Sequence, residues 1–162
     1  MALNTTGIGQ EELQSLVPHK GKMFLLSRIT GYDIEAGTLQ AEYDITENCI
    51  FYDPAIGGLP SWVSFEFMAQ SISALSGLIG RSKGHKPRPG FILSVSNLVI
   101  TQPVLQTGAT VQIRVWEDYR TDMVFTFNCE VLLENKSAAT VKLTVMEAAD
   151  ISHLKKTGEK TR

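Results

Sequence analysis

Hydrophobic residues follow a strand-like alternation over much of the chain and a helical pattern in one long central segment. Residues 61–80 carry apolar side chains on nearly all faces of a helix, which predicts a helix that other elements must enclose. Four later segments are rich in Val, Ile, Thr and Phe and are separated by turn residues, a pattern typical of antiparallel strands. We expect these strands at residues 91–100, 110–119, 123–133 and 137–146.

The part of the chain before the central helix predicts one short helix, two strands and a loop. A helix is expected over residues 11–16, and Pro18 ends it because proline restricts the residue before it. Apolar runs and alternation at residues 23–26 and 38–45 predict two paired antiparallel strands. Residues 48–60 are so dense in Gly and Pro that they predict a loop with defined turns.

This order of elements has a simple physical solution. A curved antiparallel sheet that wraps around one long central helix buries the apolar faces of both, so we predict an α+β protein with the hotdog fold. No repeat or linker interrupts the chain, which predicts a single domain over residues 1–154 and a disordered polar tail at residues 155–162. Because an edge strand would be left unpaired, we expect a homodimer or a higher oligomer.

Composition and charge narrow the classes of function. The chain has 43% hydrophobic and 20% charged residues and a formal net charge of −2, which disfavours a nucleic-acid-binding protein. It shows neither a signal peptide nor an apolar run of membrane-spanning length, so we expect a cytoplasmic protein with no membrane partner. Cys49 and Cys129 are poorly accompanied by histidine, and no nucleotide or metal motif is present, so neither a metal nor a cofactor is expected.

Glu66 is the most unusual residue of the central helix, because its sequence neighbours are apolar. Burial would raise the pKa of its carboxyl group, and a carboxylic acid kept neutral near physiological pH can protonate a departing hydroxyl group. A Glu66 that reaches the surface or pairs with an arginine would have no such role. Gln70 lies one turn later on the same face and could orient the carboxyl group.

His19 is the best placed of the three histidines to act as a base. A neutral imidazole can accept a proton from the carbon next to a thioester carbonyl at physiological pH. A histidine in this position can equally have a structural role, with its nitrogens bonded to the backbone. The start of the central helix adds free N–H groups and a positive dipole end, so a carbonyl oxygen could bind near Ser61, Trp62 and Val63.

One basic segment follows the central helix. Its charges could simply favour the helix C-terminus within a solvated loop. They could also dock an acidic carrier protein or the phosphate of its pantetheine arm. The residues of this segment are Arg81, Lys83, Lys86 and Arg88.

Two motifs resemble the β-hydroxyacyl-acyl-carrier-protein dehydratases of the hotdog fold. The opening segment at residues 16–29 and Phe-Glu-Phe-Met-Ala-Gln at residues 65–70 look like that family's opening and its central-helix motif. The family usually has a histidine in the loop before this helix, where the present chain has Tyr52 and Asp53. An opening with Pro-His-Lys-Gly-Lys-Met and a loop without histidine is similar to the divergent dehydratases of aryl polyene pigment clusters.

The resemblance implies an enzyme that converts a 3-hydroxyacyl thioester on acyl carrier protein into a trans-2-enoyl thioester, in fatty-acid or polyene-type biosynthesis. In this hypothesis His19 removes the α-proton, Glu66 protonates the hydroxyl group, and Tyr52 lies against the substrate. Two alternatives stay open. A hotdog thioesterase would use Glu66 to activate water. A noncatalytic chain would bind acyl groups or form a heterodimer with an active hotdog dehydratase.

Overall fold

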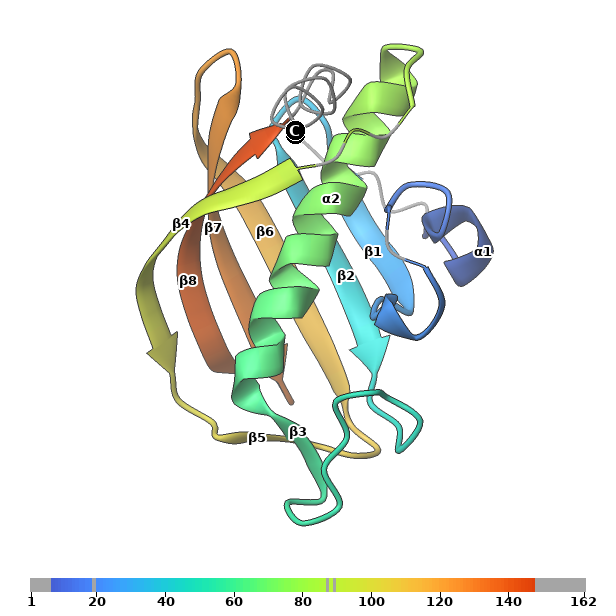
Figure 1. Ribbon diagram of the computed structural model, residues 1–162, viewed down its shortest axis with the longest axis vertical. Coiled ribbons are helices and arrows are strands. Elements are labelled where there is room, and N and C mark those ends of the chain that lie inside the picture. Colours follow the sequence, from blue (N-terminus) through green and yellow to red (C-terminus); the bar gives the residue numbers. More distant parts are fainter. Residues whose placement is uncertain (1–6, 19, 87, 89, 148–162) are drawn as a thin grey trace, which may run out of the picture.

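A curved six-stranded sheet wraps around one long helix, α2 (Ser64–Ser82), in the computed structural model (Figure 1). The structure describes residues 7–18, 20–86, 88 and 90–147. All neighbouring strands of the sheet are antiparallel, which confirms the predicted α+β hotdog fold. In spatial order the strands are β1 (Arg28–Asp33), β2 (Thr38–Asp44), β6 (Thr110–Arg120), β7 (Val124–Leu133), β8 (Lys136–Glu147) and β4 (Gly90–Ile100).

The four strands predicted after the central helix are confirmed to within a residue at each end, but the first strand is placed wrongly by the sequence pattern. Residues 23–26 form no strand, and the chain instead makes a short 3-10 turn at Gly21–Met23 before β1 begins at Arg28. Residues 24–26 are buried, whereas Met23 is exposed, and the run packs near α2, where the Leu25 N–H donates to the side chain of Gln70. An apolar run thus marked a buried segment without indicating its backbone conformation.

Several short elements were absent from the sequence prediction or differ from it. The first helix, α1 (Gln10–Leu13), is shorter than expected, and a 3-10 turn at Ser61–Val63 precedes α2. The predicted loop before α2 ends in β3 (Gly58–Pro60), which pairs with β5 (Val104–Gln106) at one end of the molecule (Figure 1). These small strands attach the start of α2 to the segment that follows β4.

The core lies between the concave side of the sheet and one side of α2. Phe67, Met68 and Leu75 are almost completely buried, and the Phe67 ring packs against Tyr43 at a centroid distance of 5.1 Å. At Gly77 a Cβ atom would lie 2.3 Å from the Leu16 carbonyl oxygen, so this glycine lets the opening segment pack directly on the helix backbone. Other α2 residues, Glu66 among them, are only half-buried. The sheet therefore does not enclose the whole circumference of the helix.

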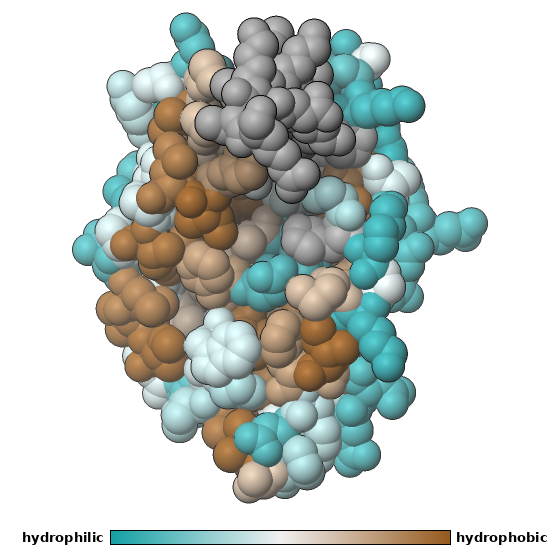
Figure 2. All heavy atoms as spheres, viewed as in Figure 1, coloured by the Kyte–Doolittle hydropathy of each residue, from teal (hydrophilic) through white to brown (hydrophobic). Residues whose placement is uncertain are grey.

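Strand β4 is an apolar edge of the sheet. Each of its eleven residues is exposed, and within the described part of the chain it pairs with β8 alone. Figure 2 shows hydrophobic side chains gathered over this side of the molecule. The largest exposed apolar residues of the strand are Phe91, Ile92, Leu93, Val95, Leu98, Val99 and Ile100.

Both cysteines are buried free thiols, and burial raises the pKa of Cys129 to about 12. Among the described residues, no cluster of three or more His, Cys, Asp or Glu side chains is arranged to hold a metal ion. No helix in this part of the chain has the length and hydropathy needed to cross a membrane. The described residues form one helix-and-sheet unit. The expected tail at residues 155–162 lies outside the described residues, and the domain boundary at residue 154 stays a prediction.

Candidate active site

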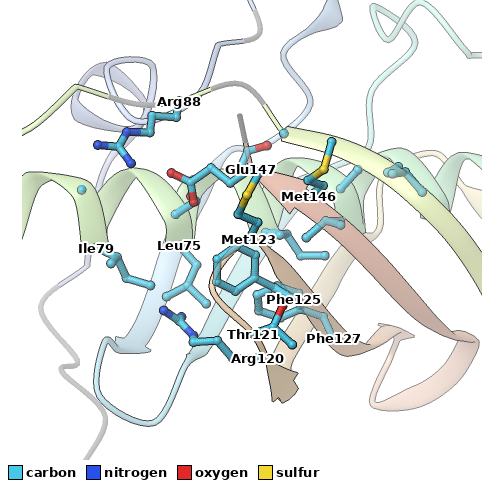
Figure 3. A pocket seen from close by; sticks show the side chains of 18 of the residues that line it. Leu75, Ile79, Arg88, Arg120, Thr121, Met123, Phe125, Phe127, Met146 and Glu147 are labelled. Atoms are coloured by element: carbon cyan, nitrogen blue, oxygen red, sulfur yellow. The ribbon is translucent and has the colours of Figure 1, made fainter. Parts of the chain in front are cut away.

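A pocket of about 520 Å³ lies between α2 and the sheet. Side chains from α2 line one wall, while β4, β7, β8 and the turn between β6 and β7 line the other (Figure 3). Its size and largely hydrophobic lining are typical of a site for a small molecule or an acyl group. The large apolar residues of the lining are Ile72, Leu75, Ile79, Ile92, Met123, Phe125, Phe127, Val145 and Met146.

Glu66 lies in this lining, in the first part of α2. Its side chain is half-buried, and its Oε1 atom accepts a hydrogen bond of 3.0 Å from Gln70 Nε2. The predicted contact between these two residues is therefore present, because positions four apart lie on the same helix face. The structure places a carboxyl group, held in one orientation, at the wall of an apolar pocket.

Gln70 connects this carboxyl group to the opening segment of the chain. The residue is 0% exposed, and its Oε1 atom accepts a 2.8 Å hydrogen bond from the Leu25 N–H. Its Nε2 atom donates to the Met23 carbonyl oxygen at 2.7 Å as well as to Glu66. A single amide side chain thus satisfies two backbone groups of the opening segment and orients Glu66. Neither backbone contact could be read from the sequence, since it joins residues far apart in the chain.

Replacing Gln70 with methionine should lower the free energy of unfolding by about 1–3 kcal/mol, because the buried Leu25 N–H and the partly buried Met23 carbonyl would lose their partner. Urea unfolding followed by circular dichroism measures this change. Gln112→Met is the matched control, since Gln112 is half-buried on β6. Equal losses in the two variants would contradict the structural role given to Gln70.

The residues predicted to bind the substrate carbonyl gather at the start of α2, outside the lining of this pocket. The Ser61 N–H donates to Pro103 O at 3.1 Å and its hydroxyl group donates to Gln102 O, so this amide is already bonded within the protein. Trp62 is 58% exposed and meets the Phe51 ring edge-on, whereas Val63 is completely buried.

Tyr52 also lies outside the pocket lining. It is half-buried against the core, and its N–H donates to Cys49 O at 3.0 Å. A role of Tyr52, Ser61, Trp62 and Val63 in substrate binding stays a prediction.

The basic residues after α2 divide into two groups. Lys83 and Arg88 line the large pocket at the end farthest along α2 from Glu66. Arg81 and Lys86 line a neighbouring groove of about 290 Å³. Arg81 forms an ion pair of 2.7 Å with Glu12 and also donates to Ser15 Oγ, so it holds the segment around α1 against the helix.

His19 lies outside the described residues. The described segments on either side of it both contact α2, through Leu16 at Gly77 and through Met23 at Gln70. His85 also lines the large pocket, and its backbone N–H donates to Gly80 O at 3.0 Å.

Sequence reasoning missed the wall that the sheet contributes to the pocket. The alternation of Phe125 and Phe127 indicates that they share one face of β7. It does not reveal that this face meets α2 across an open pocket rather than in a closed core.

Curated relatives of this chain are bacterial dehydratases. It is 27% identical over 143 residues to the 3-hydroxyacyl-[acyl-carrier-protein] dehydratase FabZ of Rickettsia akari, which covers 83% of this chain and 92% of that protein. It is 26% identical over 100 residues to the enzyme of the same name from Chlamydia trachomatis, over 60% of this chain. The match spans 65% of the length of the Chlamydia protein.

Solved structures show the same fold. A chain of the dehydratase heterocomplex ApeI:P from Xenorhabdus doucetiae matches with a TM-score of 0.79 at 17% identity, over 90% of this chain and 96% of that one. A putative thioesterase from Ralstonia eutropha matches with a TM-score of 0.56 at 22% identity, over 73% and 82%. The family model described as ApeP dehydratase matches residues 11–156, nearly the whole sequence. The chain therefore belongs to the ApeP-like dehydratase family.

Proposed function

We propose that this chain is a cytoplasmic enzyme that removes water from a 3-hydroxyacyl thioester on acyl carrier protein and leaves a trans-2-enoyl thioester. The observation that carries the proposal is Glu66, held by Gln70 at the wall of an apolar pocket. A carboxyl group in that position can protonate the hydroxyl group on the β-carbon, so that the C–O bond breaks and water leaves. The names of the curated relatives support this reaction.

The reaction also needs a base for the α-proton, and we propose His19 for that role. The imidazole takes the proton, the electron pair of the C–H bond forms the new double bond, and Glu66 supplies the proton for the departing hydroxyl group. Support comes from the described neighbours of His19, since Leu16 and Met23 both contact α2 and Met23 binds the amide that orients Glu66. Exchange of protons with water returns both groups to their starting states.

We propose that the carrier protein docks where Lys83, Lys86 and Arg88 lie, beyond the end of α2. Their positive charges suit an acidic protein surface or a phosphate group. Lys83 and Arg88 line the pocket itself, so an arm that enters beside them would run along α2 toward Glu66. Arg81 lies beside this surface, but its guanidinium group already binds Glu12 and Ser15.

Incubation of the full chain with a 3-hydroxyacyl carrier protein tests the function directly. Mass spectrometry of the carrier protein should show the loss of one water with the thioester intact. Release of free thiol would instead identify a thioesterase. No reaction, followed by activity after a second hotdog chain is added, would identify a partner subunit.

We further propose that a second hotdog chain covers β4. The strand offers eleven exposed residues without a charged side chain, and no other described strand pairs with its outer edge, which is therefore open to pairing with another chain. The related structure from Xenorhabdus doucetiae is a dehydratase heterocomplex, which supports a heterodimer as well as a homodimer.

Lysine at both Leu93 and Val99 should abolish this assembly, because each position is 52% exposed and a charge buried there without a partner is costly. Size-exclusion chromatography with light scattering should then show the mass of a single chain. Ile56→Lys is the control, since Ile56 is an exposed apolar residue away from β4. An unchanged mass in the double variant would contradict the interface. Coexpression with a second hotdog chain separates the heterodimer from the homodimer.

A further inference from the structure

Arg120, at the end of β6, supports one wall of the pocket through Phe125. Its guanidinium carbon lies 4.7 Å from the centroid of the Phe125 ring, and both residues line the pocket. A guanidinium group over an aromatic face is an attractive contact. Figure 3 shows the two side chains on the sheet side of the pocket, opposite Leu75 of α2. Phe125 is half-buried, so its ring is a surface that a ligand in the pocket would meet.

Glu117 fixes the position of Arg120. The Arg120 Nε and Nη2 atoms donate to the two carboxylate oxygens of Glu117 at 2.6 and 2.8 Å. A paired contact of this kind between guanidinium and carboxylate sets the orientation of the arginine as well as its distance. The bond to Glu117 raises the pKa of Arg120 further. This arginine is therefore bound within the protein rather than available for an anionic ligand.

The backbone fixes Glu117 in turn. Its N–H donates to Gly37 O at 2.9 Å, and its side chain is only 15% exposed. A Cβ atom at Gly37 would lie 2.7 Å from Glu117 Oε2, and this glycine has a φ of +69°. The turn between β1 and β2 thus leaves the space that the Glu117 carboxylate occupies. A continuous series of contacts leads from Gly37 through Glu117 and Arg120 to Phe125.

We propose that Phe125 is a specificity-determining residue, and that Arg120 and Glu117 are positioning residues that hold its ring in the pocket wall. The proposal rests on the proposed function, since it takes the pocket to hold an acyl chain. The ring limits how long or how bulky that chain can be. Its removal leaves an apolar space, and apolar spaces in proteins accept apolar ligands. Release of Arg120 frees the ring to change rotamer and widens the pocket on the same side.

Calorimetric titration with hexanoyl-, decanoyl- and tetradecanoyl-coenzyme A tests how the Phe125 ring affects binding of the acyl chain. The reaction is not required, because these saturated thioesters carry no hydroxyl group to eliminate. The measured quantity is the ratio of Kd values for the long and the short thioester. Phe125→Ala should shift this ratio about tenfold or more in favour of the long chain. Arg120→Met and Glu117→Gln should shift it in the same direction by a smaller factor.

Arg114→Met is the matched control, because Arg114 reaches Glu130 at 4.0 Å across the same two strands and does not line the pocket. Its ratio should equal that of the unmodified chain. Phe125→Leu guards against loss of folding, since it removes the aromatic ring but keeps a large apolar side chain.

An unchanged ratio in both Phe125 variants, or no binding of any thioester, would overturn the proposal. An unchanged ratio in Arg120→Met alone would overturn the positioning role. Failure of the proposed function has a different signature. If the chain leaves 3-hydroxyacyl carrier protein intact but its variants show the shifted ratio of Kd values, the dehydratase assignment is wrong. The role of Phe125 in selecting the acyl chain is then retained.

Discussion

Replacing Glu66 with glutamine is expected to lower kcat for dehydration by about 10²- to 10⁴-fold, the range for loss of a positioned general acid. Glutamine has nearly the same shape and can still bond to the Gln70 amide, but it has no carboxyl proton to give to the departing hydroxyl group. The substrate should still bind, so KM should change much less than kcat. Mass spectrometry of a 3-hydroxyacyl carrier protein over time measures the rate.

Glu130→Gln is the control for this substitution, because Glu130 is a half-buried glutamate on β7 that does not line the pocket. Its activity should match that of the unmodified chain. Full activity in the Glu66→Gln variant would remove Glu66 from the mechanism. In that case a second chain must supply the acid, or the carboxyl group serves only the packing of α2.

Replacing His19 with alanine should produce a loss of similar size, because the α-proton would have no positioned base. The imidazole must be neutral to accept this proton. Imidazole added to the solution should restore part of the activity of the variant. No such rescue is expected if His19 has a purely structural role.

Two further variants test whether the loss of activity in His19→Ala belongs to the imidazole of His19. Lys20→Ala changes the next residue, which is exposed, and tests whether any disturbance of the opening segment is enough to lower the rate. His85→Asn tests the imidazole of His85, which lines the pocket. A large loss in His85→Asn together with full activity in His19→Ala would reassign the base to His85.

The elements that the sequence predicted well are those in which one local pattern has one structural solution. Apolar side chains all around residues 61–80 predict a central helix, and α2 occupies nearly that range. Alternating β-branched residues between turns predict the four later strands within a residue. The apolar run at residues 23–26 belongs instead to an irregular segment that follows a 3-10 turn and binds Gln70, so the strand predicted there was wrong.

The candidate site divides in the same way. The contact between Glu66 and Gln70 follows from helical spacing alone and is present in the structure. The residues expected to bind the carbonyl at the start of α2 were chosen from a generic property of helix ends. There the Ser61 N–H binds Pro103, a residue that only the pairing of β3 with β5 brings close. No local pattern carries that information.

The sequence by itself determined the fold class, the central helix and the pair Glu66–Gln70, because periodic burial and i, i+4 spacing depend on near neighbours in the chain. Only the tertiary structure decided what Gln70 binds, where the pocket lies and which residues form its wall. Gly37, Glu117, Arg120 and Phe125 come from two strands and a turn, and their contacts depend on how the sheet curves around α2. The register and curvature of a sheet arise from many weak pairings between distant segments, and no single stretch of sequence specifies them.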